Sequence, residues 1–252
     1  MTNSTIQKAE EYPIEERIKA DLDTISKMSE KLLPTLFKLV DTLSGSTTAK
    51  ASNDMDIDDN TSTQKSNSTP QETAQKIHHV TMAIQALAQI TPAKFLQTMF
   101  QKLLTRLLTA SQQDDDSEQN MSKISSLLNL ANALVSSASL EPASITLLYR
   151  AIKPLIRTDE YSPNIQKRAY RVMAALCKNY TAFIVGGKLE EVIELMVGSL
   201  MTCQVAARSV RLQCLEYVVG GLDCKNKKHM VSYLRFYQLD IVLVDSFPYS
   251  DP

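Results

Sequence analysis

Three segments of the 252-residue chain carry apolar side chains at the same helical spacing. In each segment, four apolar residues follow one another at intervals of 3, 1 and 3 residues. They are Val80, Ala83, Ile84 and Leu87; Ile124, Leu127, Leu128 and Ala131; and Ala169, Val172, Met173 and Leu176. Such a stripe on one side of an amphipathic helix packs against neighbouring elements. The chain is therefore predicted to fold as a stack of amphipathic helices, and no strand-like alternation competes with this pattern before the C-terminal tail.

The predicted helices alternate between two kinds. First helices begin near residues 93, 143 and 188, at intervals of 50 and 45 residues. Second helices begin near residues 121, 164 and 205, at intervals of 43 and 41 residues. Helix pairs that recur about every 40 to 47 residues are typical of HEAT-type repeats. We therefore predict an all-α fold, a HEAT-type α-solenoid of about four helix pairs.

A polar segment, residues 44–71, interrupts the first predicted pair, residues 31–43 and 72–90. Met55 and Ile57 are its only large apolar side chains, which is too few to offset the entropy of ordering the segment. We predict a disordered insertion at this place. The predicted organisation is residues 1–43 as N-terminal helices, 44–71 as the insertion, 72–230 as HEAT-like helical repeats and 231–252 as an atypical tail.

Two prolines fall inside predicted helices, Pro34 in residues 14–43 and Pro154 in residues 143–156. Proline removes a helical hydrogen bond and its ring clashes with the preceding turn. We therefore expect a break or kink near residues 31–33 and a bend or end at Pro154. After Met230 the helical pattern is lost without a partner helix, so we interpret the chain as a fragment or a truncated gene product.

Positive charge is concentrated in one part of a chain whose net charge is only -1. Residues 164–235 contain 11 Lys and Arg against 5 Asp and Glu. On a helical wheel, Lys167, Arg171 and Lys178 fall within about 40° of each other, opposite the apolar stripe. A basic stripe of this kind can follow RNA phosphates. The alternative interpretation is a solvated helix face.

Nine basic residues form the candidate RNA- or partner-binding set. They are Lys167, Arg168, Arg171, Lys178, Arg208, Arg211, Lys225, Lys227 and Lys228. Arg211 has a second interpretation, because an Arg at this place in a HEAT repeat often pairs with an acidic residue of a neighbouring repeat.

No arrangement of residues predicts catalysis, a metal or a cofactor. Cys203, Cys214, Cys224 and His229 are spaced by 11, 10 and 5 residues, which matches no compact zinc module. The chain has neither a GxxxxGKS/T nor a GxGxxG phosphate-binding motif. Cys177 and Cys214 lie among apolar residues and are interpreted as core thiols. We therefore predict a non-enzymatic protein without cofactors.

The sequence also indicates a protein that is not bound to a membrane. No apolar run approaches the roughly 18 residues of a membrane span, and the N-terminal segment lacks the apolar region of a signal peptide. None of the four cysteines forms a CxxC pair. We expect an intracellular compartment and free thiols rather than disulfides.

The segment from Leu148 to Gly221 resembles a known family. Residues 148–177 read LYRAIKPLIRTDEYSPNIQKRAYRVMAALC, and their most specific part is the hexapeptide QKRAYR of residues 166–171. Residues 208–215, RSVRLQCL, continue the resemblance into the next repeat. Both are similar to the ribosomal RNA-processing protein 12 family, whose members are HEAT-repeat proteins much longer than this chain.

The resemblance implies a scaffold in ribosome biogenesis, located in the nucleus and nucleolus. It implies roles in pre-rRNA processing and in the assembly and export of ribosomal subunits. The implied partners are pre-ribosomal particles, pre-rRNA, and ribosome-assembly or nuclear-transport proteins. Two alternatives stay open: a HEAT-repeat scaffold of nuclear transport or other protein interactions, and an accessory helical domain of an RNA-modifying enzyme.

Overall fold

The computed structural model describes residues 14–46, 70–112, 117–137, 139–157, 161–223, 225–226 and 231. Helices account for most of these residues, and no strand occurs among them. The helices are α1 (Ile14–Ser46), α2 (Pro70–Ile90), α3 (Ala93–Gln112), α4 (Glu118–Ser137), α5 (Pro142–Arg157), α6 (Pro163–Asn179), α7 (Thr181–Phe183), α8 (Leu189–Gly198) and α9 (Arg208–Gly220). A π-helical turn, Ile184–Lys188, joins α7 to α8, and a 3₁₀ turn, Val205–Ala207, precedes α9.

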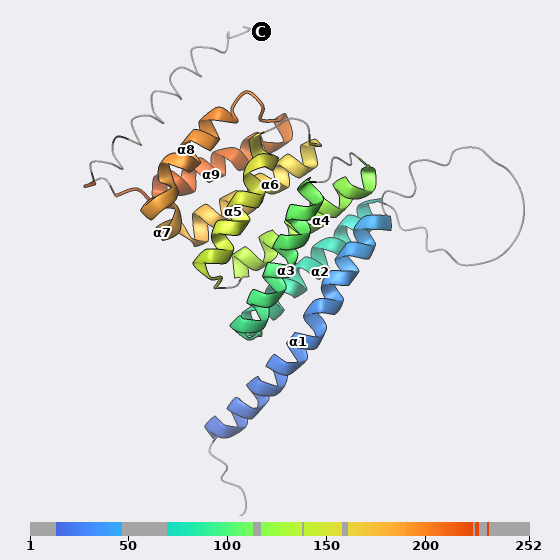
Figure 1. The fold of residues 1–252 in the computed structure, drawn as a ribbon. Coiled ribbons are helices and arrows are strands. Elements are labelled where there is room, and N and C mark those ends of the chain that lie inside the picture. The colour runs from blue at the N-terminus through green and yellow to red at the C-terminus, as the bar shows by residue number, and fades with distance from the viewer. Residues whose placement is uncertain are drawn as a thin grey trace, which may run out of the picture.

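The helices form pairs that stack along one direction, as Figure 1 shows. Contacts join α1 to α2, α3 to α4, α5 to α6, and α8 to α9. The second helices of these pairs, α2, α4, α6 and α9, contact one another in succession and form one layer. The first helices α3, α5 and α8 also pack in succession, while α1 contacts α2 and α4. This arrangement confirms the predicted all-α solenoid.

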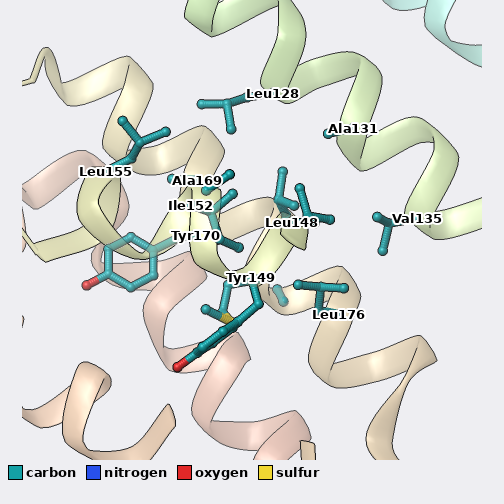
Figure 2. Close-up of a cluster of buried hydrophobic side chains, with 14 of the residues drawn as sticks. Leu128, Ala131, Val135, Leu148, Tyr149, Ile152, Leu155, Ala169, Tyr170 and Leu176 are labelled. Atoms are coloured by element: carbon teal, nitrogen blue, oxygen red, sulfur yellow. The ribbon is translucent and has the colours of Figure 1, made fainter. Parts of the chain in front are cut away.

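The predicted apolar stripes lie in the core between the two layers. Figure 2 shows Leu128, Ala131 and Val135 of α4 beside side chains of α5 and α6. All four stripe residues of α4 and all four of α6 are at most 1% exposed. The stripe of α2 is less buried. Within the described part, α2 packs against one other helix of its layer, α4, whereas α4 and α6 each pack against two. In the α2 stripe Ile84 is buried, Val80 and Leu87 are half-buried, and Ala83 is exposed.

The two prolines do not break their helices. α1 continues through Pro34 as one helix, so the first of the two expected outcomes near residues 31–33, a break, does not occur, while a kink there stays a prediction. The buried side chains of Leu33, Phe37 and Val40 on both sides of the proline hold this part of α1 against the core, which offsets the lost hydrogen bond. α5 likewise passes through Pro154 and ends at Arg157.

Several predicted features lie outside the described residues. The insertion was predicted at residues 44–71, whereas α1 extends to Ser46 and α2 begins at Pro70; residues 47–69 lie outside the described part. The predicted tail, residues 231–252, also lies outside the described part, apart from Val231.

Candidate functional site

α6 carries the predicted basic stripe, and a buried amide fixes its position. Pro163 opens the helix, where its missing N–H costs no hydrogen bond. The side-chain amide of Gln166, which is fully buried, donates to the carbonyl oxygens of Ile156 at 3.3 Å and Thr202 at 3.0 Å. Its oxygen accepts the backbone N–H of Gln204 at 2.8 Å. These bonds tie the start of α6 to the end of α5 and to the loop before α9.

Two hollows lie along the layer of second helices. The first, of about 450 Å³, lies between α2, α4 and α6. The second, of about 230 Å³, lies between α4, α6 and α9. Asn132 of α4 and Arg171 of α6 line both hollows. The two hollows are therefore continuous parts of one surface, which we call the second-helix groove.

The second-helix groove is polar and positively charged. Its polar and aromatic lining consists of His78, Thr81 and Gln85 of α2; Ser122, Ser125, Asn129, Asn132 and Ser136 of α4; Arg168, Arg171, Lys178 and Asn179 of α6; and Gln213 and Tyr217 of α9. Among the described residues that line the two hollows there is no Asp or Glu. Proteins bind phosphate oxygens with cationic side chains and with hydroxyl and amide donors. The groove therefore has the chemistry of an anion-binding surface.

The groove brings together part of the predicted basic stripe. Arg171 and Lys178 are exposed and line it. The Lys178 ammonium nitrogen lies 5.8 Å from the centre of the Tyr217 ring, within the range of a cation–π contact. Lys167 is half-buried on the same helix and does not line either hollow.

Arg168 belongs to the wall of the groove and is already engaged. It is half-buried, and its Nη1 donates to the carbonyl oxygen of Ser125 at 3.3 Å. Burial, and then the positive charge of Arg171, lower the pKa of Arg168. We infer that Arg168 mainly joins α6 to α4 and adds to the positive potential between them.

Arg211 is buried, unlike the other described residues of the predicted site. Its side chain is only 8% exposed. Nε and Nη2 both donate to the carbonyl oxygen of Met196, at 3.2 and 2.7 Å. That carbonyl lies in the last turn of α8, where unpaired carbonyls and the helix dipole favour a cation. These contacts favour a structural role for Arg211 over the predicted binding role, and its hydrogen-bond partner is a backbone carbonyl rather than an acidic side chain.

Replacing Arg211 by Met should lower the free energy of unfolding by about 2 kcal/mol, because it leaves a buried carbonyl without its charged donor. Urea unfolding followed by circular dichroism measures this change. Arg208→Met is the matched control, since Arg208 is exposed at the start of the same helix and should change stability by less than about 0.5 kcal/mol. Equal losses in the two variants would contradict the capping role of Arg211.

The other predicted residues lie away from the groove. Arg208 and Lys225 are exposed and line neither hollow. Lys227 and Lys228 lie outside the described residues.

Sequence reasoning missed the uncharged half of the groove. Ser122, Ser125, Asn129 and Asn132 follow one another on α4 at intervals of 3, 4 and 3 residues. This spacing places them on one side of the helix. A search for polar stripes, in addition to charge, could have found them.

The thiols in the described part are those of core residues. Cys177, Cys203 and Cys214 are buried and free. Burial raises the pKa of Cys177 to about 12 and that of Cys214 well above its usual value, the opposite of an activated thiolate. The described residues contain no group of three or more His, Cys, Asp or Glu side chains placed to hold a metal ion. Of the described helices, none combines the length and apolar character needed to cross a membrane.

The structure is that of a helical-repeat protein with a basic, polar groove along its second helices. Comparisons with known proteins add a distant relative. A human protein named RRP12-like protein is 25% identical to this chain over 154 residues. The similar region covers 60% of this chain and 11% of the human protein, so the chain spans about a tenth of that relative's length. No family model matches the chain. The similarity supports a distant relationship to the RRP12-like protein.

Proposed function

We propose that this protein is a non-catalytic scaffold in ribosome biogenesis, which holds pre-ribosomal RNA in the second-helix groove and proteins on the remaining solenoid surface. The observation that carries the proposal is the groove itself. Arg171 and Lys178 are exposed in a surface that runs over four successive second helices and has no carboxylate in its described lining. A negatively charged polymer can contact such a surface at several points without repulsion.

Two further observations support the biological setting. The distant similarity is to a protein whose name contains RRP12, in agreement with the resemblance of residues 148–221 to the ribosomal RNA-processing protein 12 family. The buried, protonated thiols of Cys177 and Cys214 favour a structural rather than a chemical role. We accordingly propose action in pre-rRNA processing and in subunit assembly and export, within the nucleus and nucleolus.

Recovery from cells tests this proposal. The tagged full chain should sediment with pre-ribosomal particles on a density gradient, and the RNA that it brings down should be enriched in pre-rRNA. A variant with Lys167, Arg171 and Lys178 changed to Glu should move toward the free fractions. Recovery of transport factors and their cargo without pre-rRNA would contradict the proposal and favour the nuclear-transport alternative.

A further inference from the structure

The first hollow of the second-helix groove contains three amide side chains that the protein leaves available. Gln85 of α2 and Asn129 and Asn132 of α4 line it, and all three are half-buried. Within the described part of the chain, the structure gives none of these three amide groups a hydrogen bond. Their donors and acceptors are therefore open to water or to a bound molecule.

The chemistry of these amides differs from that of the cations beside them. An amide donates through its NH₂ group and accepts through its carbonyl oxygen, and a phosphate offers no donor to that oxygen. The edge of a nucleic-acid base carries donors and acceptors side by side, so that an Asn or Gln amide can form two hydrogen bonds with adenine. A cluster of three amides therefore fits a base better than it fits a phosphate.

The first hollow also offers apolar contacts and a suitable size. Ile77 and Met82 of α2 line it together with the amides, and a flexible Met thioether packs well against a flat aromatic ring. The volume of about 450 Å³ is typical of pockets that hold one small molecule. A single unpaired base can enter such a hollow, whereas a double helix is too large for it.

The structure places this hollow next to the exposed cations. Asn132 of α4 and Arg171 of α6 line both hollows, so they face the same space. One turn further along α4, the Asn179 amide donates to the carbonyl oxygen of Val135 at 3.2 Å and holds α4 and α6 side by side. Lys178 follows Arg171 by seven residues, about 10 Å along α6. A strand with phosphates at these two cations can therefore place a base among the amides.

We propose that the second-helix groove binds single-stranded RNA, with one unpaired base in the first hollow and neighbouring phosphates at Arg171 and Lys178. The inference rests on the proposed function, because it needs RNA in this groove, and it adds that the RNA is unpaired. In an RNA duplex the bases are paired, and the major groove is too deep and narrow for side chains to read. Only an unpaired base can turn its edge toward the amides.

Binding of the full chain to three RNA probes tests the inference. The probes are a single strand, the duplex of the same sequence, and a single strand of equal length that has abasic nucleotides in place of the bases. The abasic strand keeps the phosphates and removes every base, so it tests the base contact without any change in the protein. Fluorescence anisotropy should show that the wild type binds the intact single strand at least about tenfold more tightly than either other probe.

Changing Asn129 and Asn132 together to Leu removes two amides and leaves the cations in place. This amide variant should bind the intact single strand roughly ten- to thirtyfold more weakly than the wild type does, and it should bind the abasic strand as the wild type does. Its slope of log K against log salt concentration should stay unchanged, because no phosphate contact is lost. Gln97→Leu with Gln101→Leu is the matched control. These amides lie on α3, in the layer of first helices, and their loss should change RNA affinity by less than about twofold.

The possible outcomes separate this inference from the proposed function. Equal wild-type affinity for the intact and abasic strands would overturn the inference, as would an amide variant that binds the intact strand like the wild type. The proposed function would still stand in either case if the change of Lys167, Arg171 and Lys178 to Glu weakened binding. Tighter binding of the duplex would overturn the inference and indicate recognition of helix shape. Tighter binding of polyglutamate than of any RNA would overturn both and indicate an acidic protein segment as the partner.

Discussion

Replacing Leu176 by Asp should lower the free energy of unfolding by roughly 3 to 5 kcal/mol. Leu176 is fully buried on α6, and Figure 2 shows it within the cluster formed with α4 and α5. A carboxylate there would lose its water without gaining a partner. For a chain of this size the melting temperature should fall by about 10 °C or more. Thermal unfolding followed by circular dichroism measures the fall.

Leu147→Asp provides the matched control for this substitution. Leu147 lies on α5 of the same helix pair, but it is 42% exposed. The same change of side chain should therefore cost less than about 0.5 kcal/mol, because the carboxylate can stay in water. Similar losses for Leu147→Asp and Leu176→Asp would contradict the assignment of the core face of α6.

Changing Lys167, Arg171 and Lys178 together to Glu should weaken RNA binding by at least about a hundredfold, taking about 1.5 kcal/mol for each charged hydrogen bond that is lost. None of the three side chains lies in the core, so the melting temperature should stay close to that of the wild type. The loss should be similar for pre-ribosomal RNA and for unrelated RNA of equal length, because phosphate contacts carry no sequence information. Fluorescence anisotropy with both RNAs measures it.

The control for net charge is a second triple variant, in which Lys94, Lys102 and Arg150 are changed to Glu. These three cations are exposed on α3 and α5, in the layer of first helices. This variant has the same change in total charge and leaves the groove intact. Its RNA affinity should fall far less than that of the groove variant. Equal losses would mean that overall charge, rather than the second-helix groove, determines binding.

The solenoid could be predicted from the sequence because its core residues recur at the spacing of one helix face, and this spacing can be read directly from the sequence. The stripes of α4 and α6 are set by residue spacing alone, and each is buried as the spacing predicts. A helix break at Pro34 could not be excluded from the sequence, because a local rule counts the lost hydrogen bond but not the packing of Leu33, Phe37 and Val40 around the proline.

The binding surface could be predicted only in part, because it depends on which helices lie side by side. Lys167, Arg171 and Lys178 share a side of α6 by spacing, but only the structure shows that Arg171 and Lys178 line a hollow and that Lys167 does not. Arg211 appeared equivalent to these cations in the sequence. The structure shows that Arg211 instead donates to the backbone carbonyl of Met196, which belongs to another helix. Every residue has a backbone carbonyl, so residue types could not indicate this contact.

The salt dependence of RNA binding tests the second-helix groove as a phosphate-binding surface most directly. Each phosphate contact on single-stranded RNA releases counterions and contributes roughly 0.7 to the slope of log K against log salt concentration. Arg171 and Lys178 line the groove, and Lys167 lies outside it on the same side of α6. If all three contact phosphates, the slope for the triple Glu variant should be shallower than that of the wild type by about 2. Equal affinity and equal slope in the two proteins would contradict the groove as an RNA site and leave these three residues as a solvated helix face.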